Sequence, residues 1–144
     1  MKTPSQNSAH KFLKFFLISS LVLPAVSYSE TQTIKLSSVL PNIEVADNYS
    51  SRRRGLMFRS SLQSNTGMLF IWKDYTTRCM WMKNTSLPLS VAYLSNDGVI
   101  KEIYNMVPFS EESVCSANST RIALEVNAGW FKENGIAAGD KLDF

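Results

Sequence analysis

The stretch SVAYLSNDGVIKEIY, residues 90–104, carries the clearest structural signal in the chain. Apolar and polar residues alternate on both sides of a central Asn-Asp-Gly, which is the pattern of two partly buried strands. Asp97-Gly98 supplies the positive φ values that a tight turn between antiparallel strands requires. The stretch therefore predicts a β-hairpin with strands at 90–94 and 99–104.

Two runs of aromatic and bulky apolar residues precede the hairpin. They read MLFIW at 68–72 and CMWMK at 79–83, and Gly, Asp and Asn residues bound them. Short runs of this kind are typical of strands that are buried on both faces. We expect these two strands to form the core.

The residues before the core runs predict two strands and a helix. Weak alternation indicates strands at 31–36 and 43–45. A short helix follows at about 49–57, because either Asp47 or Asn48 can accept hydrogen bonds from its first free amides.

The residues after the hairpin begin with a polar loop at 108–119. An alternating strand is expected at 121–126. Asn127 is placed to cap a helix of about two turns that ends at Gly135. A final strand is predicted at 141–144.

The expected elements define the fold class. About eight short strands and two short helices make the chain mainly β, or β-rich α+β, and the helices do not alternate regularly with the strands. A partly closed, barrel-like sheet or a compact sandwich is therefore favoured over a doubly wound parallel sheet.

The first residues have the features of a secretory signal peptide. Three lysines precede the apolar run 15–23, and small Ala25 and Ser27 fit a cleavage site after Ser27. The run is shorter than the roughly 20 residues that span a bilayer, so an uncleaved anchor is the less favoured alternative. We expect a periplasmic or extracellular protein with no transmembrane segment after cleavage.

Loss of residues 1–27 changes the charge and removes the histidine. Lys2, Lys11 and Lys14 go with the leader, so 15 basic residues fall to 12, against 12 acidic residues. Balanced charge gives no reason to expect nucleic acid as a partner. His10, the one histidine in the sequence, is also lost, which excludes a histidine-dependent triad or zinc site.

The two cysteines, Cys79 and Cys115, remain after processing. An even number in an oxidising compartment favours a structural disulfide between them. The alternative is one thiol buried in the core and one in a loop.

Several ordered motifs resemble a known family. They are RGLMFR at 54–59, GMLF at 67–70, WMKNT at 81–85, LEVNAG at 124–129 and the later Gly135-Ile136 and Gly139-Asp140. In order and spacing they are similar to the family called domain of unknown function 192, over roughly residues 42–144. The resemblance implies one small β-barrel-like domain, often exported, after an N-terminal segment at 28–41. It brings no established activity, and Cys79 departs from the pattern, where an aromatic residue is more familiar.

Polar residues within these motifs suggest a binding cleft. Alternation puts Trp81 and Lys83 on one face of their strand. If Lys83 and Glu125 face the same cleft, they can orient a polar ligand while Trp81 offers a flat stacking surface. The candidate ligand-binding residues are Arg54, Arg59, Trp81, Lys83, Asn84 and Glu125.

Each candidate also has a structural interpretation. Lys83 and Glu125 can form an ion pair beside a buried tryptophan, and this interpretation is favoured. The arginines can bind a carboxylate or phosphate through their forked donors, but a solvated helix face is the commoner explanation. Met80, Met82 and Cys79 offer soft ligands for cuprous copper, although core packing accounts for them better.

These observations favour a non-catalytic module of the cell envelope that binds a small polar ligand, a glycan or a protein partner. We expect no cofactor, no metal and a monomer. One alternative is a carboxylate-dependent hydrolase of envelope polysaccharide or peptide. Another is a structural accessory that docks an envelope protein through a strand edge or the loop 108–119.

Overall fold

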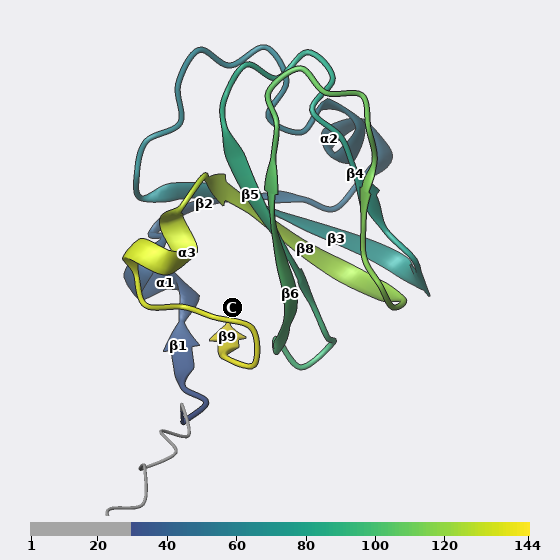
Figure 1. The fold of residues 1–144 in the computed structure, drawn as a ribbon. Helices are drawn as coiled ribbons and strands as arrows, with labels where there is room; N and C mark the ends of the chain where they lie inside the picture. The colour runs from purple at the N-terminus through teal and green to yellow at the C-terminus, as the bar shows by residue number, and fades with distance from the viewer. Residues whose placement is uncertain (1–29) are drawn as a thin grey trace, which may run out of the picture.

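Nine strands and three short helices make up residues 30–144, the part of the chain that the computed structural model describes (Figure 1). In chain order they are β1 (Thr33–Lys35), α1 (Leu36–Val39), β2 (Asn42–Ala46), α2 (Tyr49–Arg54), β3 (Thr66–Thr76), β4 (Cys79–Met80), β5 (Leu89–Leu94), β6 (Ile100–Met106), β7 (Val114–Cys115), β8 (Thr120–Asn127), α3 (Trp130–Glu133) and β9 (Lys141–Asp143). The mainly β class is confirmed. The predicted signal peptide lies outside the described residues.

Five strands form the main sheet, in the order β2-β3-β8-β5-β6. The β2–β3 pair is parallel and the other pairs are antiparallel, so the sheet is mixed. The expected barrel-like closure is not found, because β2 and β6 lie at opposite edges of an open sheet. Closing so few strands would demand strong tilt and stagger. The remaining strands pair separately, as β1–β9 and β4–β7.

The predicted hairpin is confirmed as the β5–β6 pair. Gly98 closes its turn at φ 86°, and its amide donates to the Ser95 carbonyl oxygen at 3.0 Å. A Cβ at this position would collide with the Leu142 carbonyl oxygen in β9. Glycine therefore serves both the turn and a close backbone approach.

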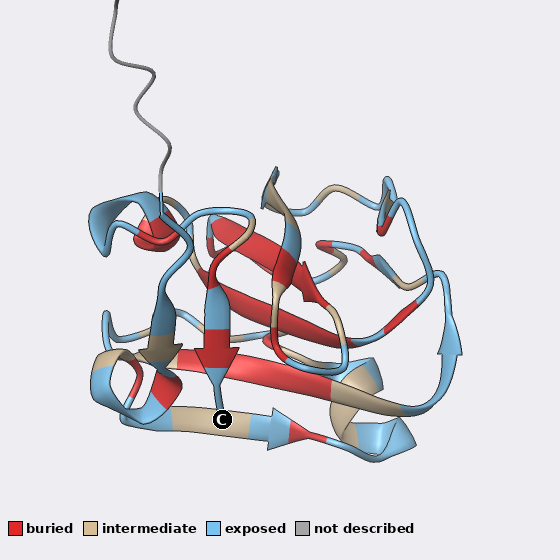
Figure 2. Ribbon diagram, turned by 90° about the horizontal axis from the view of Figure 1, so that it is seen from below, coloured by how far each residue is buried: buried red, intermediate tan, exposed pale blue. Residues whose placement is uncertain are grey.

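Strand β8 lies at the centre of the sheet and separates two hydrophobic clusters. Ile122, Leu124 and Val126 face the first cluster, which α1, α3, β1 and β9 help to cover. Ala123 belongs to the second cluster, with Phe70 of β3 among its members. Buried positions accordingly run along the sheet strands in Figure 2, whereas α2 and the loops are mostly exposed or half-buried.

Two of the predicted helices differ from those observed. Helix α2 begins as expected at Asn48, whose side-chain oxygen accepts from the Ser51 amide at 3.0 Å, but it ends at Gly55. The predicted cap at Asn127 is wrong. Asn127 is still in β8, its side-chain amide donates to the Leu62 carbonyl oxygen at 3.0 Å, and Gly129 precedes the shorter α3. Antiparallel pairing with β5, in which Asn127 lies opposite Leu89, keeps β8 extended through this residue.

The first and last strands of the described chain lie side by side and run parallel (Figure 2). The Lys141 amide donates to the Gln32 carbonyl oxygen at 2.8 Å, and the Gln32 amide donates to the Asp140 carboxylate at 3.1 Å. The strand predicted through Leu36 is shorter, because Leu36 starts α1 and is buried. No helix within residues 30–144 is long and apolar enough to cross a membrane.

Candidate functional site

Glu125 is a carboxyl group buried at the centre of the sheet. It lies in β8 opposite Met68 of β3 and Val91 of β5, and it is 4% exposed. No side chain or amide within the described residues 30–144 hydrogen-bonds its carboxyl. Burial raises the pKa of Glu125 to about 8, because the charged form loses its hydration. Its carboxyl is therefore mostly protonated at neutral pH.

Glu125 lines a narrow space that we call the inner cavity. The cavity has a volume of about 30 Å³. Because a water needs at least about 10–15 Å³, it holds one or two water-sized groups. The residues lining the cavity are Arg52, Arg53, Arg54, Gly55, Leu56, Met57, Phe70, Met80, Trp81, Met82, Thr85, Leu89 and Glu125.

A wider space, the outer basin, adjoins the inner cavity. It has a volume of about 380 Å³ and is lined by Ser50, Arg53, Arg54, Met57, Phe58, Trp81, Lys83 and Asn84. The two spaces share Arg53, Arg54, Met57 and Trp81 as walls. Glu125 is the one acidic residue that lines either space within the described chain. The outer basin therefore carries basic and aromatic groups, and the carboxyl lies at the inner end.

Strained backbone surrounds the outer basin. Phe58 and Asn84 have φ values of 64° and 54°, and the Phe58 amide donates to the Asn84 carbonyl oxygen at 2.8 Å. Phe109, at φ 60°, donates in the same way to the Thr85 carbonyl oxygen at 3.0 Å. Positive φ is unfavourable for phenylalanine, and such strain clusters at functional sites. Phe58 and Phe109 are also largely exposed, at 71% and 65%.

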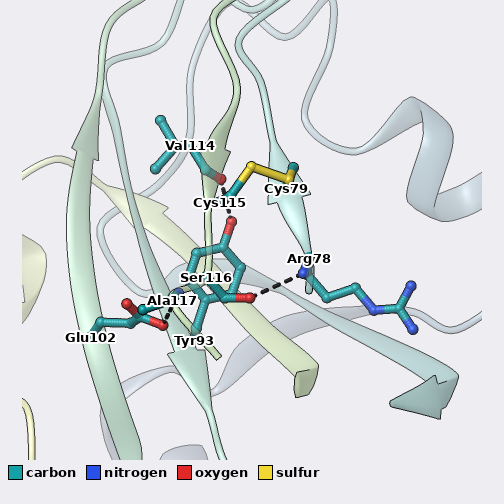
Figure 3. The surroundings of a disulfide bond; sticks show 8 residues. All are labelled: Arg78, Cys79, Tyr93, Glu102, Val114, Cys115, Ser116 and Ala117. Atoms are coloured by element: carbon teal, nitrogen blue, oxygen red, sulfur yellow. Dashed lines mark hydrogen bonds between the residues drawn. A yellow bond between two sulfur atoms is a disulfide. The ribbon is translucent and has the colours of Figure 1, made fainter. Parts of the chain in front are cut away.

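The predicted disulfide is present in the structure (Figure 3) and directly precedes, along the chain, a segment that lines the inner cavity. Cys79 and Cys115 face each other in the β4–β7 pair, with a Cα–Cα distance of 3.9 Å. The Tyr93 hydroxyl donates to the Val114 carbonyl oxygen at 2.6 Å and links this pair to the main sheet. Because residues 80–82 follow Cys79 directly, the disulfide fixes the segment that carries three cavity residues.

The structure places five of the six candidate residues around the two spaces. Arg54 and Trp81 line both, Lys83 and Asn84 line the outer basin, and Glu125 lines the inner cavity. Arg59 does not join them.

Arg59 instead forms an ion pair with Glu44 of β2. Its two guanidinium nitrogens lie 2.5 and 2.8 Å from the two carboxylate oxygens. The hydrogen bonds from Arg59 lower the pKa of Glu44. Arg59 is therefore occupied in a structural pair, and its predicted place in the cleft is wrong.

The favoured interpretation of Lys83 and Glu125 as partners is also wrong. The Lys83 ammonium lies 3.6 Å from the Glu111 carboxylate and 5.2 Å from the centre of the Trp81 ring. Trp81 is 44% exposed rather than buried. Lys83 therefore makes a cation–π contact with one face of the Trp81 ring at the edge of the outer basin.

Most lining residues were not among the candidates, and they include Met57, Phe58, Met80, Met82 and Thr85. Four of these five lie inside the motifs at 54–59 and 81–85, which also contain Arg54 and Trp81. The motifs therefore indicated the lining residues, although residues such as methionine are more typical of a hydrophobic core. The copper interpretation loses one ligand, because Cys79 is in the disulfide.

Four chains of known structure match this chain, among them the following two. A crystal structure of a proposed transcription regulator from Sinorhizobium meliloti 1021 is 40% identical, with a TM-score of 0.67 over 69% of this chain and 78% of that chain. A protein of unknown function from Novosphingobium aromaticivorans DSM 12444 is 33% identical, with a TM-score of 0.68 over 71% of this chain and 74% of that chain. No curated protein matches the chain.

The motifs of the sequence extend across the whole described fold. The family model of domain of unknown function 192, described as an uncharacterized ACR, matches residues 31–144 and so includes β1 as well as the site. Arg54, Trp81 and Glu125 all fall inside this match. The chain belongs to the family of domain of unknown function 192.

Proposed function

We propose that the protein is a non-catalytic binding module that takes a small polar ligand in the inner cavity and outer basin. Glu125 is the observation that carries this proposal. A buried carboxyl without a partner costs free energy of folding, so a protein keeps one where a function uses it. Because this carboxyl lines a cavity, a ligand group can reach it.

The outer basin supports the same function. Trp81 and Phe58 present exposed aromatic surface beside three basic side chains and the Asn84 amide. Apolar walls with a few polar groups are the usual composition of small-molecule sites. A volume of about 380 Å³ lies at the lower end of the range for such sites.

Two other functions have less support. A carboxylate-dependent hydrolase needs two carboxyl groups flanking the scissile bond, and within the described chain only Glu125 lines the site. Docking of an envelope protein through the loop 108–119 is supported by the exposed side chain of Phe109 and by that of Val107, which precedes the loop. We place the module outside the cytoplasm, because a disulfide is typical of oxidising compartments.

A ligand screen tests the proposed function. Amino acids, amino sugars, uronic acids and neutral sugars would be titrated into the protein while Trp fluorescence and ligand-observed NMR are followed. We expect at least one compound to bind, and the Glu125→Gln variant to lose most of that affinity. If nothing in the panel binds, or if Glu125→Gln binds as well as the wild type, the proposal is wrong.

Two phenylalanines provide a matched control for the outer basin. Phe58→Gly and Phe109→Gly both remove an exposed ring from a residue at positive φ, so both leave the fold no less stable. Phe58 lines the outer basin and Phe109 lines neither space. We expect only Phe58→Gly to weaken ligand binding.

A further inference from the structure

The Glu125 carboxyl has no counter-ion within the described chain. Arg52, Arg53 and Lys83 are engaged elsewhere, and Arg54, which also lines the inner cavity, forms no ion pair with Glu125. The Arg52 guanidinium donates to the Ile71 carbonyl oxygen at 2.9 Å, and the Arg53 guanidinium donates to the Tyr49 hydroxyl at 3.1 Å. Lys83 pairs with Glu111. Glu125 therefore forms no ion pair within the described chain, and a cationic group from outside can supply the counter-charge.

The size of the inner cavity limits what that group can be. About 30 Å³ admits one or two water-sized groups. A sugar ring, a phosphate or a quaternary ammonium group is too large. A primary ammonium group has nearly the size of a water molecule and fits.

The walls of the inner cavity favour a hydrogen-bond donor. Thr85 lines the cavity, and since its hydroxyl donates to the Lys83 carbonyl oxygen at 3.1 Å, its oxygen is left to accept. The three arginines that end α2 also line the cavity, but none of them pairs with Glu125 within the described chain. The other walls, such as Met80, Met82 and Phe70, are apolar. Thr85 thus adds a second acceptor to the lining that contains Glu125.

The outer basin favours an anionic group. Arg54 lines both spaces, is exposed and makes no ion pair within residues 30–144. Its guanidinium is therefore available to an anionic group, which arginine binds through two donors.

We infer that the ligand is a small zwitterionic amino compound, whose primary ammonium group enters the inner cavity and pairs with Glu125 while its anionic group meets Arg54 in the outer basin. This inference rests on the proposed binding function and names its ligand class. Polar complementarity at both ends sets the orientation of the ligand.

Ammonium binding at this site releases a proton. Glu125 is mostly protonated below pH 8, so it gives its proton to solvent when the ammonium group pairs with the carboxylate. The other groups that face it do not titrate between pH 6 and 8. Burial raises the pKa of Tyr93 further above neutrality, and Cys79 is in the disulfide. The affinity for ammonium should therefore rise about tenfold per pH unit from pH 6 to 7 and level off above pH 8.

Four small probes test the inference in the intact protein. They are β-alanine as the zwitterion, methylammonium as the cation, acetate as the anion and acetamide as the neutral compound. NMR shift changes of the methionine methyl groups would be followed at pH 6, 7 and 8. We expect β-alanine to bind more tightly than methylammonium, with affinity rising with pH, and acetate and acetamide not to bind in the inner cavity.

Two variants sharpen the test. Glu125→Gln should abolish binding of both amines, and a cooperative urea-unfolding transition would show that the variant is folded. Arg54→Ala should lower the affinity for β-alanine to the affinity for methylammonium. If acetate or acetamide binds equally well, or if affinity falls as the pH rises, the ammonium assignment is overturned while the proposed function stands. If the wider ligand panel also fails, the proposed function falls with it.

Discussion

At the scale of single residues, Glu125 shows how one buried group gives a protein a pH response. Its carboxyl loses hydration in the sheet and gains no partner, so the protonated form is favoured in the folded state. In the unfolded chain the same group titrates near 4.5. The difference between the two pKa values makes the free energy of unfolding depend on pH.

We predict that this protein becomes less stable as the pH rises from about 4.5 to 8. Over that range the folded state binds more protons at Glu125 than the unfolded state does, so each rise in pH favours unfolding. Glu125→Gln removes this slope and is more stable than the wild type at pH 8 by up to a few kcal/mol. Urea unfolding at pH 5, 6, 7 and 8 measures both effects.

Glu112→Gln serves as the control, because Glu112 is exposed in the loop before β7. It should keep the slope of the wild type. An equal slope in Glu125→Gln and the wild type would show that Glu125 is ionised in the folded protein.

The sequence pattern predicted which face of β8 carries Glu125. It did not predict which residues pair with the other candidate side chains. Alternation along residues 121–126 was enough to separate Glu125 from the aliphatic residues of β8. The partner of Arg59 was missed, because Glu44 lies in a strand whose parallel pairing with β3 has no local signal. Pairing between distant residues depends on topology, which periodicity does not contain.

At the scale of elements, the β4–β7 pair controls the cavity wall. Two residues of β4 are too few to hold a strand position by backbone hydrogen bonds alone, and the disulfide supplies the constraint. Met80, Trp81 and Met82 depend on it for their place beside Glu125.

We predict that Cys79→Ser with Cys115→Ser lowers the free energy of unfolding by roughly 3–4 kcal/mol, because the disulfide closes a loop across a sequence separation of 36 residues. Ligand affinity should fall as well, since the wall segment is released. Urea unfolding and the ligand titration measure the two losses.

Dithiothreitol provides the control for this pair of substitutions. The described chain has no free cysteine, so the reductant should weaken the wild type and leave the double variant unchanged. Unaltered ligand affinity in the reduced wild type would show that the wall does not need the disulfide.

The accuracy of the predicted elements depended on how local their signals are. Asp97-Gly98 fixed the β5–β6 hairpin within a few residues. The strand predicted at 79–83 is only two residues long, because Met82 leaves the sheet and donates its amide to the Ser110 carbonyl oxygen. An apolar run shows burial, but burial under a loop looks the same as burial in a strand.

At the scale of the whole molecule, β1 and β9 join the two ends of the described chain and cover one face of the sheet. Leu142 of β9 is 1% exposed and belongs to the first hydrophobic cluster. No pattern near residues 33–35 or 141–143 showed that these strands pair with each other, since their separation exceeds 100 residues.

We predict that Leu142→Ala costs about 2–5 kcal/mol of stability, because it opens a cavity in this cluster. The neighbouring Lys141→Ala changes an exposed side chain of the same strand and should cost under about 0.5 kcal/mol. Thermal and urea unfolding compare the two variants. Equal stability of the two would mean that β9 contributes little to the core.

The β1–β9 pairing also sets an order of events during synthesis. A chain that leaves the ribosome from its amino end presents residues 33–35 more than 100 residues before their partner strand at 141–143. Leu36 and Leu40, which are fully buried in the finished fold, have no complete cover until then. Strand β1 is thus made well before it can pair, and this part of the nascent chain stays open until residues 141–143 have emerged.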